Sequence, residues 1–386
     1  MSTTPTTTQN TEECETAIQK LHELQEQMEF LTKKITHLSK HHGMENVVLL
    51  SGNSNVKLAK QIGEKLGLPI DERNVPTMFA NSELRCRIHE NLRGKDIFIV
   101  QTGCTNPKKN MSVNDIILET LIMIDACRRS MASTVTVIMP NYPYARGDKK
   151  DLARSPIPAK TIANLFESVK VDRFVSLDLH ATQIQGYMDV PFDNLYSVNL
   201  VVNCLKQNVF KNITLEERQA KYVMVSPDAG AVKRTLSFSS RVKLNMMIMH
   251  KQRNYIKANT VDKTILIQEG GDKESMKSKT AIVCDDIADT CGTLVSAINS
   301  LENYGITKVI CVITHGVFSK DALEKINNCK NILEFYVSDS IPQEENQRIC
   351  PKLKVFTISN LLGEVIKRIV TKSSISELFH PKKTTQ

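Results

Sequence analysis

The sequence predicts an α/β protein with two doubly wound, mostly parallel sheets, preceded by one N-terminal helix. Short apolar runs alternate with amphipathic helical patterns along most of the chain, and short links join them. Acidic or polar residues follow several of these runs, which is where open α/β sheets bind ligands. At 386 residues the chain is long enough for two domains with separate cores.

The composition narrows the class of partner. The net charge of +8 comes from 50 basic and 42 acidic residues that are spread along the chain, so small polyanionic substrates account for it and we expect no nucleic acid. No apolar run reaches the roughly 20 residues of a membrane span, so we expect no membrane insertion. The ten cysteines lie mostly in apolar patterns without a secretory signal. Early glutamates and a first arginine at Arg73 argue against an import peptide, so we expect a cytoplasmic protein.

The N-terminal 43 residues form a segment of their own. Residues 1–10 are Thr-rich and predict disorder. Apolar residues then recur at alternating spacings of three and four, the period of a coiled coil: Cys14, Ala17, Leu21, Leu24, Met28, Leu31, Ile35 and Leu38. An amphipathic helix lying on the globular body is the alternative. His41, His42 and Gly43 end the pattern.

Residues 44–192 are expected to form the first α/β domain. Buried strands are predicted at 46–52, 96–103, 134–140 and 172–180, with helices at 55–67, 114–130 and from 156 onward. Residues 78–89 alternate like an antiparallel strand. Residues 141–155 have few large apolar side chains and several basic ones, so they predict an exposed loop.

Residues 193–386 are expected to form the second domain. Strands are predicted at 222–228, 244–250, 264–268, 281–284, 308–316 and 332–339, and helices at 200–208, 229–241, 294–305 and 360–370. A polar loop is expected at 251–259, and the charged residues 269–279 interrupt the approach to the next strand. Whether the last helix packs back on the first domain stays open.

The stretch at residues 280–293, TAIVCDDIADTCGT, organises the second domain. A short apolar run leads into Asp285 and Asp286, then into a hydroxyl-rich turn and a new helix. Such a turn gathers backbone N–H groups and hydroxyls into a phosphate cradle, and the acids suit ribose hydroxyls or magnesium. The alternative is a buried strand and a helix that the acids cap. Adjacent carboxylates at a strand end are unfavourable without a cation or ligand, which favours the cradle.

Two other strand ends carry chemistry. Asp178 and His180 are two residues apart, so strand alternation would place both side chains on one face. Asp228 ends another strand, and Asp189 and Asp193 follow a short turn. Acids near a polyphosphate suggest Mg2+ rather than zinc, because no Cys lies at ligand spacing. The alternative for His180 is a hydrogen-bonded histidine at a sheet edge.

The chain resembles a known family. Residues 280–293 resemble the ribose-phosphate signature of the phosphoribosyltransferase superfold. More specific are the segments at 79–103, PYARGDKKD at 143–151, DLHATQIQGYMDVPFDNLY at 178–196, SPDAGAVKR at 226–234 and HKQR at 250–253. Together they are similar to ribose-phosphate diphosphokinase (phosphoribosyl pyrophosphate synthetase) of the phosphate-activated class, from about Val47 to about Leu378.

The resemblance implies two α/β domains of phosphoribosyltransferase type and a transferase of nucleotide biosynthesis. The family transfers the β,γ-diphosphate of ATP to O1 of ribose 5-phosphate and releases AMP, with Mg2+ as cofactor. The resemblance implies a homo-oligomer built from dimers, with a hexamer expected, and leaves open a hetero-oligomer with a paralogue.

The resemblance also implies roles for individual residues. Lys251 and Arg253 would be catalytic on a mobile loop, although a single loop lysine is usually only solvated. ATP would contact Phe79, Asn81, Glu83, Arg146, Asp151 and His180. Ribose 5-phosphate would contact Asp285, Asp286, Asp289, Thr290, Cys291, Gly292 and Thr293. The resemblance gives the metal to His180 and Asp228, and their placement at or after strand ends makes Asp178, Asp189 and Asp193 further candidate metal ligands. Phosphate and ADP would act as effectors at Asn91, Arg93 and Arg154.

The sequence departs from the family pattern in places. Gly147 stands where Gln is common, Ala231 replaces a usual Gly, and Asn91 stands where a Ser is common. Residues 269–279 look longer than the usual connection, which resembles non-catalytic regulatory paralogues. Those paralogues lose catalytic-loop residues, whereas His250, Lys251 and Arg253 are present here. We therefore expect an active enzyme, with a regulatory subunit and a different phosphoribosyl transferase as alternatives.

Overall fold

The computed structural model describes residues 19–20, 22–28, 43–253, 261–268 and 279–379, and gives only the backbone of residues 250–253 and 261–268. The chain divides into two compact units, 1–46 and 47–386. In the first unit, residues 19–20 and 22–28 are helical. Leu24 and Met28 are 60% and 69% exposed. The other predicted heptad positions lie outside the described residues, so the coiled coil stays a prediction.

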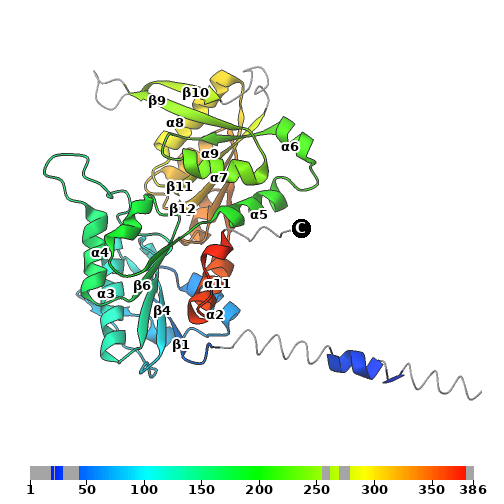
Figure 1. The fold of residues 1–386 in the computed structure, drawn as a ribbon. Helices are drawn as coiled ribbons and strands as arrows, with labels where there is room; N and C mark the ends of the chain where they lie inside the picture. The colour runs from blue at the N-terminus through cyan, green and yellow to red at the C-terminus, as the bar shows by residue number, and fades with distance from the viewer. Residues whose placement is uncertain (1–18, 21, 29–42, 254–260, 269–278, 380–386) are drawn as a thin grey trace, which may run out of the picture. The chain divides into compact units, whose positions relative to one another are not determined.

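The first sheet of residues 47–386 has five parallel strands in the order β1-β4-β5-β6-β7 (Figure 1). The strands are β1 (Val47–Ser51), β4 (Asp96–Val100), β5 (Thr134–Ile138), β6 (Arg173–Leu177) and β7 (Phe192–Leu195). The helices are α2 (Val56–Leu66), α3 (Val113–Arg129) and α4 (Pro158–Ser168), with 3-10 turns at Glu72–Asn74, Pro107–Lys109 and Thr182–Tyr187. This sheet and the helices that flank it are called the first lobe below.

A short antiparallel pair, β2 (Thr77–Met78) and β3 (Leu84–Arg85), stands apart from this sheet. It confirms the antiparallel character predicted for residues 78–89. The predicted strands of the first lobe are confirmed because their apolar runs are buried on both faces, as parallel strands covered by helices must be.

The second sheet has seven strands in the order β10-β9-β8-β11-β12-β13-β14. The strands are β8 (Tyr222–Ser226), β9 (Met246–Arg253), β10 (Val261–Gln268), β11 (Thr280–Ala288), β12 (Lys308–Gly316), β13 (Ile332–Ser338) and β14 (Leu353–Phe356). The helices of this second lobe are α5 (Val198–Asn208), α6 (Leu215–Lys221), α7 (Val232–Val242), α8 (Gly292–Ser300), α9 (Ala322–Asn328), α10 (Glu344–Ile349) and α11 (Ser359–Val370), with 3-10 turns at Leu301–Tyr304 and Ser376–Leu378. Only the β9–β10 pair is antiparallel among these strands.

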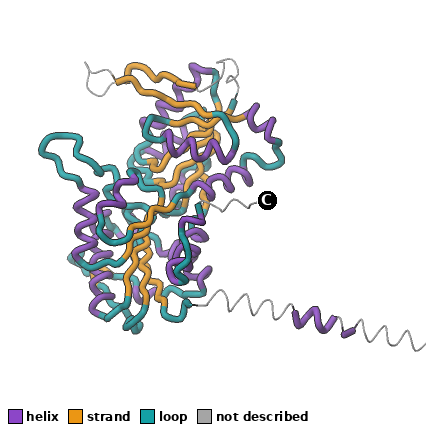
Figure 2. Tube along the Cα trace, in the orientation of Figure 1, coloured by secondary structure: helices purple, strands orange, loops and turns teal. Residues whose placement is uncertain are grey.

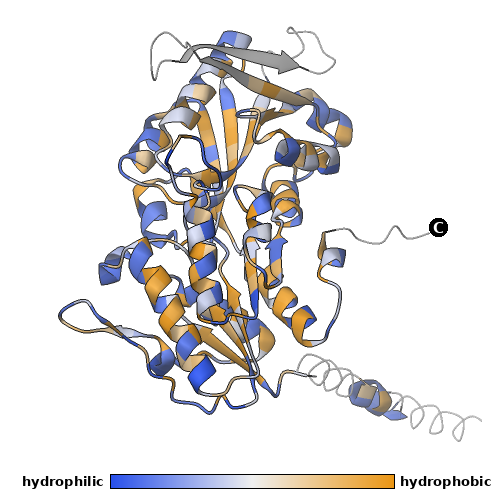
Figure 3. Ribbon diagram, turned by 60° about the vertical axis from the view of Figure 1, so that its left-hand side comes forward, coloured by the Kyte–Doolittle hydropathy of each residue, from blue (hydrophilic) through white to orange (hydrophobic). Residues whose placement is uncertain are grey.

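Alternate residues of the second sheet enter two separate cores. Val283, Cys311 and Ile313 pack with residues of α8 and α9 on one face. Ile282, Cys284 and Val312 pack with residues of α5 and α7 on the other. Strand periodicity of two therefore explains why β11 and β12 are apolar throughout. Figure 2 shows the strands between helices, and Figure 3 shows mostly hydrophobic strands between helices that carry both hydrophobic and hydrophilic residues.

Three boundaries differ from the expectation. The predicted loop at 251–259 begins later, because β9 continues to Arg253 and pairs Lys251 with Thr264 of β10. Asp285 and Asp286 lie inside β11, which continues to Ala288 beside β12. The first sheet ends at Leu195, because Phe192–Leu195 pairs with β6. Residues 193–195, which the expected division assigns to the second domain, thus belong to a strand of the first sheet. The division between residues 192 and 193 stays a proposal.

The last helix returns to the first lobe. α11 packs against α2, and Gly363 is the point of close approach, where an added Cβ would lie 3.8 Å from Cβ of Lys65. Figure 1 shows the two helices side by side. Among the helices that the structure describes, none is both long and apolar enough to cross a membrane.

Candidate active site

The carboxyl ends of β6 and β11 meet, although they belong to different sheets. Nδ1 of His180, three residues beyond β6, lies 2.8 Å from Oδ2 of Asp286. Asp286 is 4% exposed. Two strand ends that the sequence predicted separately therefore form one site across the two lobes.

Arg234 joins the same cluster, and the sequence reasoning missed it. Its Nη1 atom donates hydrogen bonds to Oδ1 of Asp285 at 3.1 Å and to Oδ1 of Asp286 at 2.8 Å. Arg234 lies in the first turn of α7, so the helix that follows Asp228 delivers it to the acids. The signal available was the pair of adjacent carboxylates, since a buried acid pair needs a counter-cation.

The electrostatics of the acid pair are asymmetric. Burial and the neighbouring Asp286 raise the pKa of Asp285. Burial also acts to raise the pKa of Asp286, but the hydrogen bond with His180 and the charge of Arg234 outweigh it and hold that pKa well below the usual range. The hydrogen bond with Asp286 raises the pKa of His180. The cluster therefore pairs a charged Asp286 with a carboxyl that holds its proton more tightly than usual.

The turn from β11 to α8 has the form expected of an anion cradle. Cys291 has a left-handed φ of 55°, and no side chain among the described residues caps α8. The acids therefore do not act as helix caps, as the alternative reading required. Oδ2 of Asp289 pairs with Nη2 of Arg146 at 2.7 Å, which brings the loop 141–155 to this turn. Nζ of Lys325, a second residue that the sequence reasoning missed, donates to the carbonyl oxygen of Thr290 at 3.4 Å.

The predicted adenine residues lie on an exposed hairpin between β2 and β3. The amide of Phe79 donates to the carbonyl oxygen of Glu83 at 2.8 Å, and Oδ1 of Asn81 accepts from the amide of Glu83 at 3.2 Å. Phe79 is 51% exposed. Among the described residues, no hydrogen bond or ion pair joins this hairpin to His180.

The remaining loop residues are exposed. Asp151 pairs with Lys149 at 3.4 Å. Oδ1 of Asn91 accepts from the amide of Arg93 at 3.1 Å, and Arg154 has a left-handed φ of 63°. Gly147, where the family commonly has Gln, has little room, since an added Cβ would lie 2.9 Å from Cδ of Pro158.

The predicted metal residues do not form one group. Asp178 is 6% exposed, and its carboxylate accepts from the amide and hydroxyl of Ser197 and, at 2.6 Å, from Oγ1 of Thr314. The expectation that Asp178 and His180 share a face assumed strand alternation. Asp178 instead has a φ of 43°, which takes it out of the strand conformation.

The other acids of that set lie elsewhere. Asp193 is level with Val175 in the register of β6 and β7, and its Oδ2 pairs with Nη1 of Arg173 at 2.7 Å. Asp189 is exposed, and its amide donates to Glu167. Oδ1 of Asp228 accepts from the amide of Ala231 at 3.0 Å, but Asp228 remains exposed at the end of β8. In the described part of the chain, no group of three or more His, Cys, Asp and Glu side chains is arranged to hold a metal unaided.

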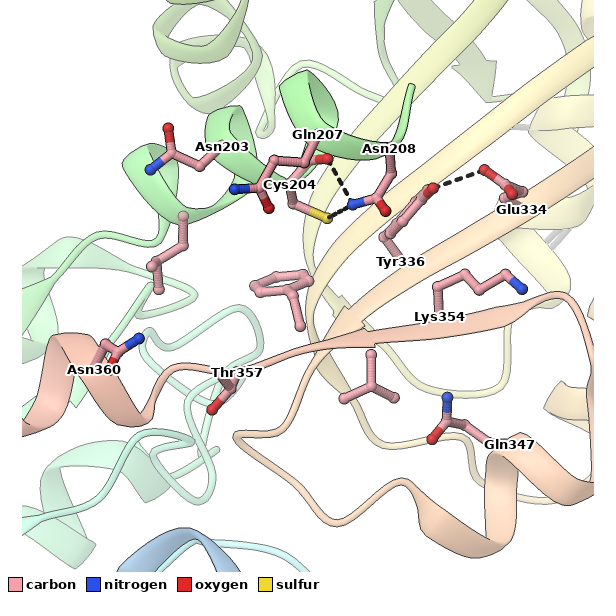
Figure 4. Close-up of a pocket in the computed structure, with 13 residues that line it drawn as sticks. Asn203, Cys204, Gln207, Asn208, Glu334, Tyr336, Gln347, Lys354, Thr357 and Asn360 are labelled. Atoms are coloured by element: carbon pink, nitrogen blue, oxygen red, sulfur yellow. Dashed lines mark hydrogen bonds between the residues drawn. The ribbon is translucent and has the colours of Figure 1, made fainter. Parts of the chain in front are cut away.

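Lys251 and Arg253 lie in β9, and their side chains are outside the described residues. A cavity of about 780 Å3 lies elsewhere in the second lobe, between α5 and the strands β13 and β14 (Figure 4). Its lining includes Asn203, Gln207, Tyr336 and Phe356, and none of the predicted site residues. The candidate site is therefore the cluster at the strand ends and not this cavity.

Comparisons with known proteins show which family the chain resembles. Residues 47–169 match the family model of the N-terminal domain of ribose phosphate pyrophosphokinase. Residues 270–380 match that of the phosphoribosyl synthetase-associated domain. The crystal structure of phosphoribosylpyrophosphate synthetase from Mycobacterium smegmatis is 33% identical, with a TM-score of 0.74 over 85% of this chain and 100% of that chain. A purine phosphoribosyltransferase from Pyrococcus horikoshii Ot3 is 16% identical over 31% of this chain and 80% of that chain, with a TM-score of 0.20.

Proposed function

Since the chain belongs to the ribose phosphate pyrophosphokinase family and is a ribose-phosphate diphosphokinase, we propose that it transfers the β,γ-diphosphate of ATP to O1 of ribose 5-phosphate. In this reaction O1 attacks the β-phosphorus, the bond from that phosphorus to the α,β-bridging oxygen breaks, and AMP leaves with the electron pair. The O1 proton passes to solvent or to a nearby base.

The observation that carries the proposal is the 2.8 Å contact between His180 and Asp286. It joins the strand end proposed for the ATP side to the strand end proposed for the ribose side. A transfer between two substrates requires the reacting atoms to lie about 3–3.5 Å apart, so both subsites must share one site.

The ribose side follows from the acids and the turn behind them. Asp285 and Asp286 would accept hydrogen bonds from the ribose hydroxyls, with Arg234 holding the two carboxylates side by side. The turn residues Asp289, Thr290, Cys291, Gly292 and Thr293 would hold the 5-phosphate. Backbone N–H groups at the uncapped start of α8 favour an anion there.

The ATP side follows from the first lobe. Phe79, Asn81 and Glu83 would contact the adenine, with Arg146 and Asp151 nearby. Phe79 is 51% exposed in the single chain, which suits a position that a neighbouring subunit covers. Lys251 and Arg253 would stabilise the charge on the transferred diphosphoryl group.

Magnesium would be held by His180 and Asp228. His180 is 41% exposed at its side chain, and exposed Asp228 uses one carboxylate oxygen for the amide of Ala231. Such a sparse donor set fits Mg2+, which is usually bound through one or two carboxylates together with substrate phosphates. When bound, the ion would neutralise charge on the phosphates.

The assembly and its regulation belong to the same proposal. We propose a cytoplasmic homo-oligomer built from dimers, with Asn91, Arg93 and Arg154 forming an effector site for phosphate and ADP. All three are exposed in the single chain, as residues of a site between subunits would be.

The decisive experiment measures AMP formation by the purified chain from ATP, Mg2+ and ribose 5-phosphate. We expect one AMP for each phosphoribosyl diphosphate. The matched variant Lys251→Ala should lower turnover by roughly 10²–10³-fold, the usual effect of removing one charge-stabilising group. No AMP from the chain alone, with AMP formed once a paralogue is added, would instead indicate a regulatory subunit. Consumption of phosphoribosyl diphosphate with a base would indicate a transferase.

A further inference from the structure

Two consecutive residues at the end of β12 bind two consecutive residues at the end of β6. Oγ1 of Thr314 donates to Oδ2 of Asp178 at 2.6 Å, and Nε2 of His315 donates to the carbonyl oxygen of Leu177 at 2.8 Å. Leu177, Asp178, Thr314 and His315 are at most 6% exposed. These four residues are called the interlobe staple below.

The chemistry of His315 fixes the direction of its bond. A carbonyl oxygen only accepts, so Nε2 carries the proton and Nδ1 is left to accept from Oγ of Ser340, 2.9 Å away. Burial lowers the pKa of His315, which keeps the ring neutral with one proton. Both ring nitrogens are therefore occupied by protein partners, one in each lobe.

The carboxylate of Asp178 is also bound by protein groups. Its carboxylate accepts from the amide of Ser197 at 3.2 Å, from the Ser197 hydroxyl and from Thr314. Its left-handed φ of 43° is unfavourable for a residue other than glycine and persists only where the surroundings hold it. The carboxylate of Asp178 therefore links the end of β6 in the first lobe to Thr314 in the second.

The staple lies next to the residues that would hold the substrates. His180 is two residues beyond Asp178 on the first-lobe side. In the pairing of β11 with β12, Asp285 is level with Ile313 and Ile287 is level with His315, so Asp286 and Thr314 are at the same level. The staple and the contact between His180 and Asp286 therefore join the same two strand ends.

We propose that the interlobe staple is a positioning element that sets the separation between the ATP–metal subsite and the ribose subsite, and that Asp178 acts through it. The inference rests on the proposed function, because it concerns the step in which the two substrates react. The staple touches neither substrate, so its loss should impair the reaction between bound substrates more than the binding of either one.

The test compares Thr314→Val, which removes the hydroxyl at nearly constant volume, with Thr314→Ser, which keeps it. Thr120→Val is the matched control, since Thr120 is equally buried in α3 and its Oγ1 donates to the carbonyl oxygen of Ile116 at 2.7 Å. Calorimetry measures the affinity for Mg-ATP alone and for ribose 5-phosphate alone, and the AMP assay measures kcat.

We expect Thr314→Val to lower kcat by about 10–100-fold, because a misplacement of about 1 Å can lower a rate by 10²-fold. Both affinities should stay within about threefold of wild type, as should kcat of Thr314→Ser and Thr120→Val. Wild-type turnover in Thr314→Val overturns the inference. Equal losses of kcat and of both affinities in Thr314→Val assign the staple to general stability and overturn it too.

A second pair of variants covers the case in which Thr314→Val does not fold. His315→Gln places an amide near the position of Nε2, whereas His315→Asn reaches only the position of Nδ1. We expect His315→Gln to keep most of the turnover that His315→Asn loses, and equal turnover would overturn the inference. A wild-type chain that forms no AMP would refute the proposed function itself, which is a separate result.

Discussion

Replacing Arg234 with Met should destabilise the ligand-free protein in a pH-dependent way. Arg234 donates to both Asp285 and Asp286, and its side chain is only 21% exposed while that of Asp286 is 6% exposed. Removing one partner of a buried ion pair usually lowers the free energy of unfolding by about 3–5 kcal/mol. Partial exposure of Arg234 favours the lower end, so we expect a loss of about 3 kcal/mol at pH 8.

The loss should shrink in acid. The charge of Arg234 lowers the pKa of Asp285, so without the guanidinium Asp285 keeps its proton to a higher pH. The loss of stability is therefore greatest at the alkaline pH where the wild type ionises both carboxylates, and it shrinks as Asp285 becomes protonated in both proteins. Urea unfolding at pH 8 and at pH 5 measures the difference, in buffer without Mg2+ or nucleotide. Lys233→Met is the matched control, because Lys233 is the preceding residue of α7 and is exposed.

Two outcomes would refute this reasoning. The first is that Arg234→Met is as stable as Lys233→Met at pH 8. The second is that Arg234→Met loses as much stability, relative to the wild type, at pH 5 as at pH 8. Arg234→Lys keeps the positive charge but not the planar guanidinium that reaches two carboxylates. We therefore expect its free energy of unfolding to lie between those of the wild type and Arg234→Met.

Three further predictions follow from the site and the N-terminal unit. Because the pKa of Asp285 is raised, the folded state keeps a proton that the unfolded state loses near the ordinary pKa of Asp, so wild-type stability should fall as pH rises from 5 to 9. Asp285→Asn should flatten this pH dependence of the free energy of unfolding, measured by urea titration. The same pH dependence in both proteins would contradict the prediction. His180→Ala should raise the Mg2+ concentration for half-maximal AMP formation by roughly 10–100-fold. Asp193→Asn should leave that concentration unchanged, because the carboxylate of Asp193 pairs with Arg173. Equal increases in both variants would indicate that Asp193 also contacts the metal. Deleting residues 1–43 should leave specific activity nearly intact and lower the assembly mass in light scattering, as should Leu24→Glu with Leu31→Glu; an unchanged mass would mean that the seam pairs no chains.

The strands and helices could be predicted because their burial follows directly from apolar periodicity. Alternate residues of β11 and β12 pack into two different cores, so both faces of these strands must be apolar, and the sequence shows this as continuous apolar runs. The adjacent acids Asp285 and Asp286 could be predicted as a binding feature for a related reason, since their charge is unfavourable in that position without a partner.

The partners of those acids could not be predicted, because they depend on contacts distant in sequence. Arg234 is 51 residues from Asp285. Asp178 was predicted from local alternation to share a face with His180, but its backbone is left-handed and its carboxylate accepts from Thr314, which is 136 residues away. Strand β9 runs past His250 because β10 pairs with it, and the polar sequence there indicates a loop. In each case a tertiary contact overrides a local pattern.

The packing of α11 on α2 has a consequence for the order in which the protein can be made. α2 buries Leu58, Ile62 and Leu66, and the helix that packs on it comes from the far end of the chain. During synthesis the five strands of the first sheet leave the ribosome long before residues 359–370 do. The part of α2 that contacts α11 therefore stays uncovered until the last helix has been made, and apolar surface exposed at such a stage is what makes folding intermediates prone to aggregate.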